Sequence, residues 1–240
     1  MTYVGQSLKR FEDHRLLAGG SSYVDDMKLP GMVHALVLRS PHAHARIRSI
    51  DTSAASQSSG VVAVFTADDL ASVVENLPTS AGAGADFLTP PPHPVLAKDK
   101  VCYVGQAVAI VVAETPESAR EGIEQVLVDY EPLTAVVDPM QAAQAGTTVV
   151  HTELGTNVVL ESVNAGGDMD AAFKQADRVV RERFHVQRLA PAPMEPRGVL
   201  ADYQPGQRSA VVDGQLGQFQ VGVVSVNDFH QVFESRVEHQ

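Results

Sequence analysis

The chain has 240 residues, of which 44% are hydrophobic and 20% charged. Its formal net charge of −11 argues against nucleic-acid binding, because phosphate contacts need clustered Lys and Arg. The longest apolar stretch, residues 107–113, is far shorter than a membrane-spanning helix of about 20 residues, and the polar N-terminus has no signal-peptide core. We therefore expect a cytoplasmic protein of one or two domains with no membrane span.

Cys102 is the single cysteine of the chain. One cysteine excludes an internal disulfide, a zinc site built on several cysteines and an iron–sulfur cluster held by this chain alone. Any redox chemistry must then rely on another chain or on an organic cofactor. Because Cys102 lies in an apolar segment with Lys100 as its only nearby cation, we interpret it as a small core residue and not as a nucleophile.

Three short strands are predicted in the first part of the chain. Residues 32–38 are apolar except at His34 and lie between Pro-Gly and Ser-Pro turns, which is typical of a mostly buried strand. A second strand should include Ile47 and Ile50, and the apolar run after Gly60 predicts a third.

The third strand should lead into a short helix. Thr66 is placed to cap this helix, and Asp69 favours its positive end. Residues 77–94 are rich in Pro, Gly and Ser and have no period, which predicts a long loop. The apolar run at 104–113 then predicts a strand that is covered on both faces.

A helix and another strand follow directly. Thr115 and Pro116 are typical of a helix start, and apolar residues recur at helical spacing up to Val126. The period then changes to two between Val126 and Tyr130. We expect a strand–helix–strand unit with a right-handed crossover that lays the helix against a sheet.

The second half predicts fewer elements. Asp168 can cap a helix, and the alternation in residues 178–188 then favours a strand with Val180, Phe184 and Val186 on one face. Three prolines in residues 189–198 require extended backbone, and a further strand should follow at 198–203.

Three histidines form the strongest candidate for a metal site. His42 and His44 are two residues apart on a segment predicted to be extended, so they could point to one side, and His34 lies upstream. A metal site would need further ligands, which Asp25 or Asp26 could supply. The alternative is that these histidines are surface or hydrogen-bonding residues after a Ser-Pro turn.

Taken together, six strings resemble a known family. They occupy residues 10–51, 60–70, 94–115, 128–138, 167–180 and 194–203, and they include PVLAKDKVCYVGQAVAIVVAET and MEPRGVLADY. In this order they resemble the large subunit of molybdenum hydroxylases, which comprise carbon monoxide dehydrogenases, xanthine dehydrogenases and aldehyde oxidases. The resemblance covers residues 3–206.

The resemblance implies a fold, a cofactor and partners. It implies an α+β chain with an N-terminal arm at 1–16, an α/β hammerhead domain at 17–135 and the start of a molybdopterin-binding domain at 136–206. The family hydroxylates carbon monoxide, aldehydes or N-heterocycles at a molybdenum–pterin centre. Its electrons pass to iron–sulfur clusters and FAD, which many members carry on separate small and medium subunits.

The tail at residues 207–240 departs from the family pattern. It lacks the glutamine-bearing strand and the Gly-Gly-Gly-Phe-Gly loop that the family places next, and the later pterin loops and catalytic glutamate are also missing. No catalytic residue is therefore assigned. Glu195 and Arg197 match a segment near the family's active-site domain, and Gln106 matches a polar position on a hammerhead strand. These three are the cofactor-binding candidates, although Gly105 and Gln106 also fit a packing and hydrogen-bonding role.

Three functional hypotheses follow. The first is the N-terminal segment of a molybdenum hydroxylase large subunit, truncated and without cofactor or activity alone. A frameshift, a premature stop or a genuinely short protein would each give this pattern. The second is an assembly module that docks iron–sulfur or flavin subunits. The third is a small metal-dependent hydrolase that uses His34, His42 and His44.

Overall fold

The computed structural model describes residues 4–77, 90–161, 166–187, 189, 192, 198–204 and 209–213. The chain divides into two compact units. The larger unit contains residues 33–187 together with 228–240, and the smaller one joins the residues up to Met32 with residues 188–227. Among the residues described, no helix combines the length and the apolar character that crossing a membrane requires.

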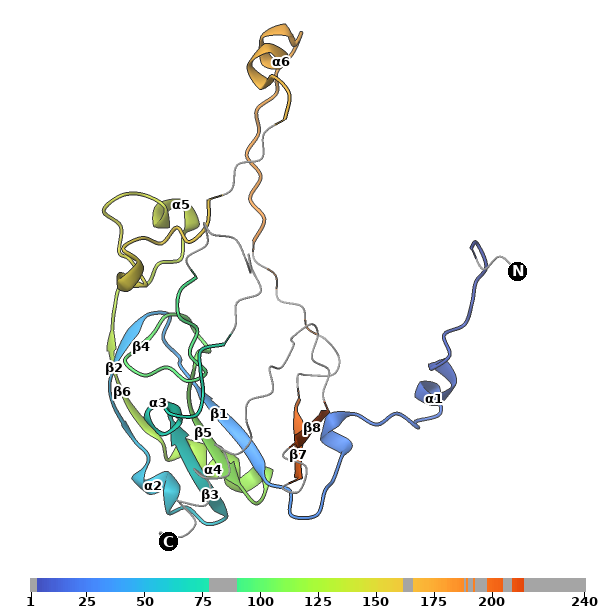
Figure 1. The fold of residues 1–240 in the computed structure, drawn as a ribbon, viewed down its shortest axis with the longest axis vertical. Helices are drawn as coiled ribbons and strands as arrows, with labels where there is room; N and C mark the ends of the chain where they lie inside the picture. Colours follow the sequence, from blue (N-terminus) through green and yellow to red (C-terminus); the bar gives the residue numbers. More distant parts are fainter. Residues whose placement is uncertain are drawn as a thin grey trace. The chain divides into compact units, whose positions relative to one another are not determined.

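The first sheet of the larger unit has three antiparallel strands. Strand β5 (Ala107–Ala113) lies between β1 (His34–Arg39) and β3 (Val61–Thr66), as Figure 1 shows. Val111 of β5 is opposite Leu36 on one side and Val64 on the other. Five of the seven β5 residues are buried. The prediction of a strand covered on both faces is therefore confirmed.

The second sheet has the order β4–β2–β6 and is also antiparallel. Its central strand β2 (Ala45–Asp51) pairs with the short β4 (Lys100–Val101) and with β6 (Leu127–Pro132). The strands predicted around Ile47 and before Tyr130 are confirmed. The two-residue strand β4 was not predicted, because so short a segment carries no period.

Helix α4 (Pro116–Glu124) packs on the first sheet. It begins as predicted: the Thr115 hydroxyl accepts a hydrogen bond from the Ser118 amide at 3.1 Å. Gly122 faces the sheet so closely that a Cβ there would lie 2.7 Å from Val61 Cγ2. The glycine therefore lets the helix approach the strands.

The predicted right-handed crossover between β5 and β6 is wrong. The two strands belong to different sheets, and every strand pair in the described residues is antiparallel. The link of Gln125 and Val126 after α4 directs the chain away from β5 and onto β2. A strand–helix–strand order in sequence does not decide which sheet the second strand joins.

Short helices fill the connections. Asp69 of α3 (Ala67–Leu70) accepts hydrogen bonds from the amide and the hydroxyl of Thr66, both at 2.7 Å, so the predicted helix is present. The other short helices of the larger unit are α2 (Ser53–Ser56), α5 (Pro139–Ala142), the 3-10 helix η2 (Thr152–Leu154) and α6 (Met169–Gln175). Asp168 caps α6 through the Ala171 amide, as expected.

The core lies on both faces of β5. Ala109 and Val111 contribute to a cluster beside α4 and α2, whereas Val112 packs with Phe65 and Leu96 in a second cluster. Val108 joins a third cluster with residues of β2 and β4, which connects the two sheets. Alternate side chains of one strand thus hold several layers together.

In the smaller unit the structure describes helix α1 (Asp13–Leu17), the 3-10 helix η1 (Val24–Asp26) and the hairpin of β7 (Leu200–Gln204) and β8 (Ser209–Asp213). Strand β7 confirms the strand predicted near 198–203.

The strand predicted at 178–188 is not formed: among residues 178–187, none belongs to a strand. Most of the loop predicted at 77–94 lies outside the described residues, and residues 90–94 have no regular structure, as expected.

Candidate functional site

The loop between β4 and β5 is tied firmly to the end of β1. The Gly105 amide donates to the Ser40 carbonyl at 2.8 Å, and the Ser40 amide donates to the Gln106 carbonyl at 2.9 Å. Gly105 has a φ of +87°, which favours glycine, whereas a Cβ there would meet no atom within 4 Å. The left-handed backbone conformation therefore explains this glycine, and the expected close backbone packing does not.

Gln106 is one of the cofactor-binding candidates, and the structure shows what it contacts. Its side chain is 5% exposed, and its Oε1 accepts a hydrogen bond from the Cys102 amide at 2.7 Å. The side chain thereby closes the loop at residues 102–106. This contact gives Gln106 a local structural role, and its cofactor role stays a prediction.

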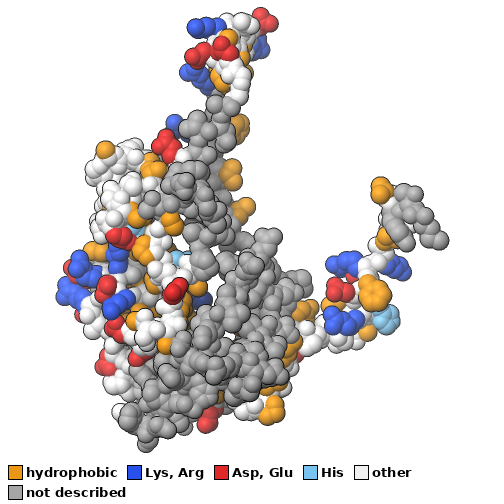
Figure 2. All heavy atoms as spheres, in the orientation of Figure 1, with side chains coloured by type: hydrophobic (Ala, Val, Ile, Leu, Met, Phe, Trp, Pro, Cys, Tyr) orange, Lys and Arg blue, Asp and Glu red, His pale blue; other side chains and the backbone are white. Residues whose placement is uncertain are grey.

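A pocket of about 590 Å³ lies beside this loop. Its wall combines parts of the chain that are far apart in sequence: the start of β2, residues 92–106, Leu133 and the η2 region. The lining residues are Arg46, Ile47, Pro92, Pro94, Lys98, Asp99, Lys100, Cys102, Gln106, Leu133, His151, Thr152 and Glu153. Figure 2 shows basic and acidic side chains gathered together over the β2–β4–β6 sheet.

The cations of the pocket have partners. Arg46 Nε lies 3.7 Å from a Glu131 carboxylate oxygen, and Lys98 Nζ lies 2.6 Å from Asp68 Oδ1. Lys100 Nζ donates to the Val150 carbonyl. The Glu131 and Asp68 carboxylates therefore offset the charges of Arg46 and Lys98, whereas Lys100 keeps its charge and uses one hydrogen bond on a neutral carbonyl.

Electrostatics in the pocket favour an ionised glutamate and a neutral thiol. A hydrogen bond from its own backbone amide, together with His151 and Lys100, lowers the pKa of Glu153. Burial raises the pKa of Cys102, Glu153 raises it further, and Lys100 opposes both effects. Cys102 therefore stays protonated at neutral pH, which agrees with the interpretation that it is not a nucleophile.

The segment that closes one side of the pocket is held by Asn157. Its side-chain amide donates to the carbonyls of Thr148 (2.9 Å) and Ala142 (3.2 Å), and its Oδ1 accepts from the Val150 amide at 2.9 Å. Sequence analysis missed Asn157, His151 and Glu153. A single polar residue in an irregular segment carries no signal for such contacts.

The structure directs the three candidate metal ligands to different neighbours. His44 Nδ1 lies 2.7 Å from the Thr134 carbonyl oxygen. The His42 ring contacts the ring of Tyr130 in a tilted arrangement, with 4.9 Å between the ring centres and 56° between the ring planes. His34 is at the start of β1, opposite Ala113. No group of three His, Cys, Asp or Glu side chains within the described part of the chain could hold a metal ion.

The remaining candidates have different outcomes. Asp26, named as a possible metal ligand, accepts a hydrogen bond from the Tyr23 amide at 2.9 Å. Glu195 and Arg197 lie outside the described residues. Among the described residues, the Nε2 atom of His44, one of the candidate metal ligands, is buried and has no hydrogen-bond partner.

Two family models match the chain. The model of the aldehyde oxidase and xanthine dehydrogenase a/b hammerhead domain matches residues 18–134, and that of the molybdopterin cofactor-binding domain matches residues 150–222. The matched hammerhead region contains both three-stranded sheets and α4. The second match extends past residue 206, where the sequence was expected to diverge.

Similar proteins are large subunits of molybdenum hydroxylases. The nicotine 6-hydroxylase large subunit of Paenarthrobacter nicotinovorans is 41% identical over 84% of this chain and 24% of its own length. The carbon monoxide dehydrogenase large chain of Afipia carboxidovorans is 38% identical over 80% of this chain and 24% of its own length. The chain thus spans about a quarter of the length of these curated relatives.

Solved structures agree with this likeness. Quinoline 2-oxidoreductase of Pseudomonas putida 86 superposes with a TM-score of 0.79 and 35% identity, covering 89% of this chain and 27% of that one. The predicted α+β class and hammerhead fold are confirmed. The chain belongs to the molybdenum hydroxylase large-subunit family, which includes aldehyde oxidases, xanthine dehydrogenases and carbon monoxide dehydrogenases.

Proposed function

We propose that this chain supplies the hammerhead domain and the start of the molybdopterin-binding domain to a molybdenum-dependent hydroxylase, as the N-terminal portion of its large subunit. The observation that carries the proposal is the two-sheet unit with α4, which lies within the matched residues 18–134. We place the domains at 17–135 and 136–206, with an arm before and a tail at 207–240, the first part of which, up to residue 222, still matches the molybdopterin-domain model. The substrate belongs to the family's range of carbon monoxide, aldehydes and N-heterocycles.

The described residues do not fit molybdopterin, the cofactor of the family. A group that carries a phosphate needs free cations or a row of free backbone amides. The cations of the pocket instead contact Glu131, Asp68 and the Val150 carbonyl. We therefore infer that the described residues by themselves hold no cofactor, and we derive no reaction step through it.

A domain exchange tests the proposal. Residues 18–134 of this chain replace the corresponding region of the carbon monoxide dehydrogenase large chain, which is then produced with its natural partners. We expect the chimera to assemble and to retain dehydrogenase activity. The matched control exchanges the same region between that protein and nicotine 6-hydroxylase. Activity in the control but none in the chimera contradicts the proposal.

The proposed partners are the iron–sulfur small subunit and the FAD medium subunit, and the proposed location is the cytoplasm. A second candidate function, a docking module for these subunits, is favoured by the loop at 102–106. Its tip exposes 47% of Tyr103 and 64% of Val104 on a backbone that Ser40 holds in place. Exposed apolar side chains on a rigid loop suit a protein contact.

Co-purification tests the docking function. The full chain is produced together with the small and medium subunits of a relative, and we expect the three to elute as one complex. A Tyr103→Asp/Val104→Asp variant should lose the partners, whereas Val137→Asp, at an 85% exposed site elsewhere, should keep them. Equal retention of the partners by both variants counts against docking through this loop.

A further inference from the structure

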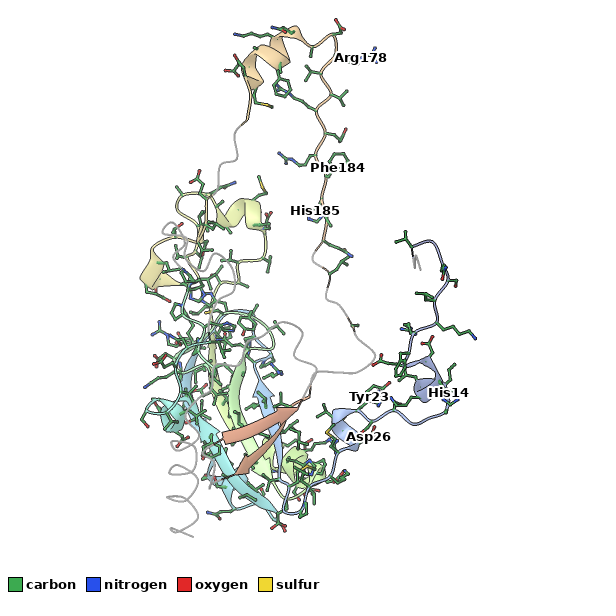
Figure 3. All side chains as sticks on the ribbon, turned by 45° about the vertical axis from the view of Figure 1, so that its right-hand side comes forward. His14, Tyr23, Asp26, Arg178, Phe184 and His185 are labelled. Carbon is green, nitrogen blue, oxygen red and sulfur yellow. The ribbon has the colours of Figure 1, made fainter. Side chains whose placement is uncertain are left out.

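Residues 135–149 connect the two regions that the family models match, and we call them the link. The hammerhead match ends at residue 134, and the molybdopterin-domain match begins at residue 150. Figure 1 and Figure 3 both show α5, which belongs to the link, beyond one end of the sheets of the larger unit. The structure describes the whole link, and none of its residues is buried. Hydrogen bonds at its ends must therefore contribute much of what holds it in place.

His44 bonds the chain where the link begins. Its carbonyl accepts from the Leu133 amide at 2.9 Å, one step beyond the pairing of Ala45 with Pro132. Its ring Nδ1 lies 2.7 Å from the Thr134 carbonyl oxygen. Because a carbonyl oxygen can only accept, the ring proton lies on Nδ1. One residue thus bonds two consecutive residues of the departing chain.

The other ring nitrogen of His44 has no such contact. The residue is 6% exposed, and Nε2 is buried without a hydrogen-bond partner in the described part of the chain. With the proton on Nδ1, Nε2 is an acceptor that no donor reaches. The bond to Thr134 is therefore the polar contact that the imidazole supplies at this position.

Lys100 bonds the chain where the link ends. Its Nζ donates to the Val150 carbonyl. The Val150 amide donates to Asn157 Oδ1, and the Asn157 side-chain amide donates to the carbonyls of Thr148 and Ala142 inside the link. Asn157 therefore connects the Lys100 contact to the interior of the link.

Both side chains come from the same part of the hammerhead. Lys100 of β4 pairs with Arg46 of β2, and His44 directly precedes β2. The two ends of the link are therefore bonded to neighbouring strands of one sheet. Leu133 and His151, which lie just outside the two ends, line the pocket. The course of the link thus decides where one wall of the pocket stands.

We propose that His44 and Lys100 form a clamp that makes the link a rigid junction between the two matched regions. Domains joined by an irregular segment otherwise move relative to each other by default. Both are positioning residues, because they act through the carbonyls of Thr134 and Val150. The clamp is independent of the proposed cofactor and partners, since every contact in it lies within this chain.

Hydrogen exchange on the full chain, measured by mass spectrometry, tests the clamp. Lys100→Met removes the bond to Val150 and keeps a side chain of similar length. We expect exchange to become roughly tenfold faster across the whole link, as far as Thr134, while β5 keeps its protection. Arg120→Met is the control, because it removes a cation at an exposed site of α4, and it should leave the link unchanged.

Substitutions of His44 separate its hydrogen bond from its bulk. Asparagine places its amide nitrogen where the ring Nδ1 stands, so His44→Asn should keep exchange in the link slow. Leucine has no donor, so His44→Leu should speed exchange across the link roughly tenfold, as far as Val150. NMR of the ring nitrogens in the unchanged chain should show the His44 proton on Nδ1.

Exchange at the far end of the link distinguishes a clamp from two separate local bonds. The His44→Leu/Lys100→Met double variant should exchange little faster than either single variant, because release at one end already frees the link. Faster exchange confined to the residues beside the substituted contact would overturn the proposal, as would unchanged exchange in Lys100→Met. If His44→Leu also removes the protection of β5, the chain has unfolded as a whole, and Lys100→Met alone decides.

Discussion

Gln106 offers a test of whether a family position acts here as a structural residue. Replacing it by leucine keeps a similar volume but removes the Oε1 atom that accepts from the Cys102 amide at 2.7 Å. The side chain is 5% exposed, so water cannot easily replace the lost acceptor. An amide left without a partner in such a place costs about 1–3 kcal/mol. We expect the free energy of unfolding to fall by about that amount.

Urea unfolding of the Gln106→Leu chain measures the effect. In a chain of this size, a loss of about 1 kcal/mol corresponds to a drop of about 2–4 °C in melting temperature. The control is Gln141→Leu, because Gln141 is exposed and its side chain carries no comparable contact. The control should stay within about 0.5 kcal/mol of the unchanged chain. If both variants are equally stable, Gln106 does not hold the loop and the argument for its structural role fails.

Three further predictions concern other parts of the larger unit. Gly122→Ala should lower the free energy of unfolding by about 1–2 kcal/mol in chemical denaturation, because the clash of the new Cβ with Val61 outweighs the gain in helix propensity. Gly166→Ala is the control, because a Cβ there meets no atom within 4 Å, and it should not lower stability. A Gly122→Ala chain that is more stable than the unchanged chain would contradict the close packing of α4 on the sheet. Asn157→Ala should speed hydrogen exchange across residues 139–157 and leave β5 protected, and equal exchange would refute its role. Alkylation of Cys102 at pH 8 should be slower than that of a free thiol, because its pKa is raised. The free energy of unfolding should also fall as pH rises through the ordinary thiol pKa, because Cys102 loses its proton at a lower pH in the unfolded chain than in the folded one. Alkylation of Cys102 at pH 8 as fast as that of a free thiol would refute the raised pKa.

Local patterns predicted most strands and helix starts of the hammerhead region. Continuous apolar residues marked β5, and Thr115 with Pro116 marked the start of α4, because these signals depend on neighbours in sequence. The sheet that β6 joins could not be predicted in this way. Tyr130 of β6 pairs with Ile47 of β2, which lies about 80 residues earlier in the chain, and no local signal specifies that pairing.

The pocket was also beyond sequence reasoning. It brings Arg46, residues 98–106 and η2 together, and Lys100 reaches the carbonyl of Val150 from 50 residues away. The strand predicted at residues 178–188 shows a different failure. Its alternation is present, but strand formation needs a paired neighbour, and the described residues supply none.

The molybdenum content of the purified full chain tests the central claim most directly. The chain is produced in a host that makes molybdenum cofactor, and metal is measured by mass spectrometry together with pterin fluorescence after oxidation. The account predicts far less than one molybdenum and one pterin per chain, because the pocket cations Arg46, Lys98 and Lys100 are already engaged. One molybdenum and one pterin per chain would contradict it.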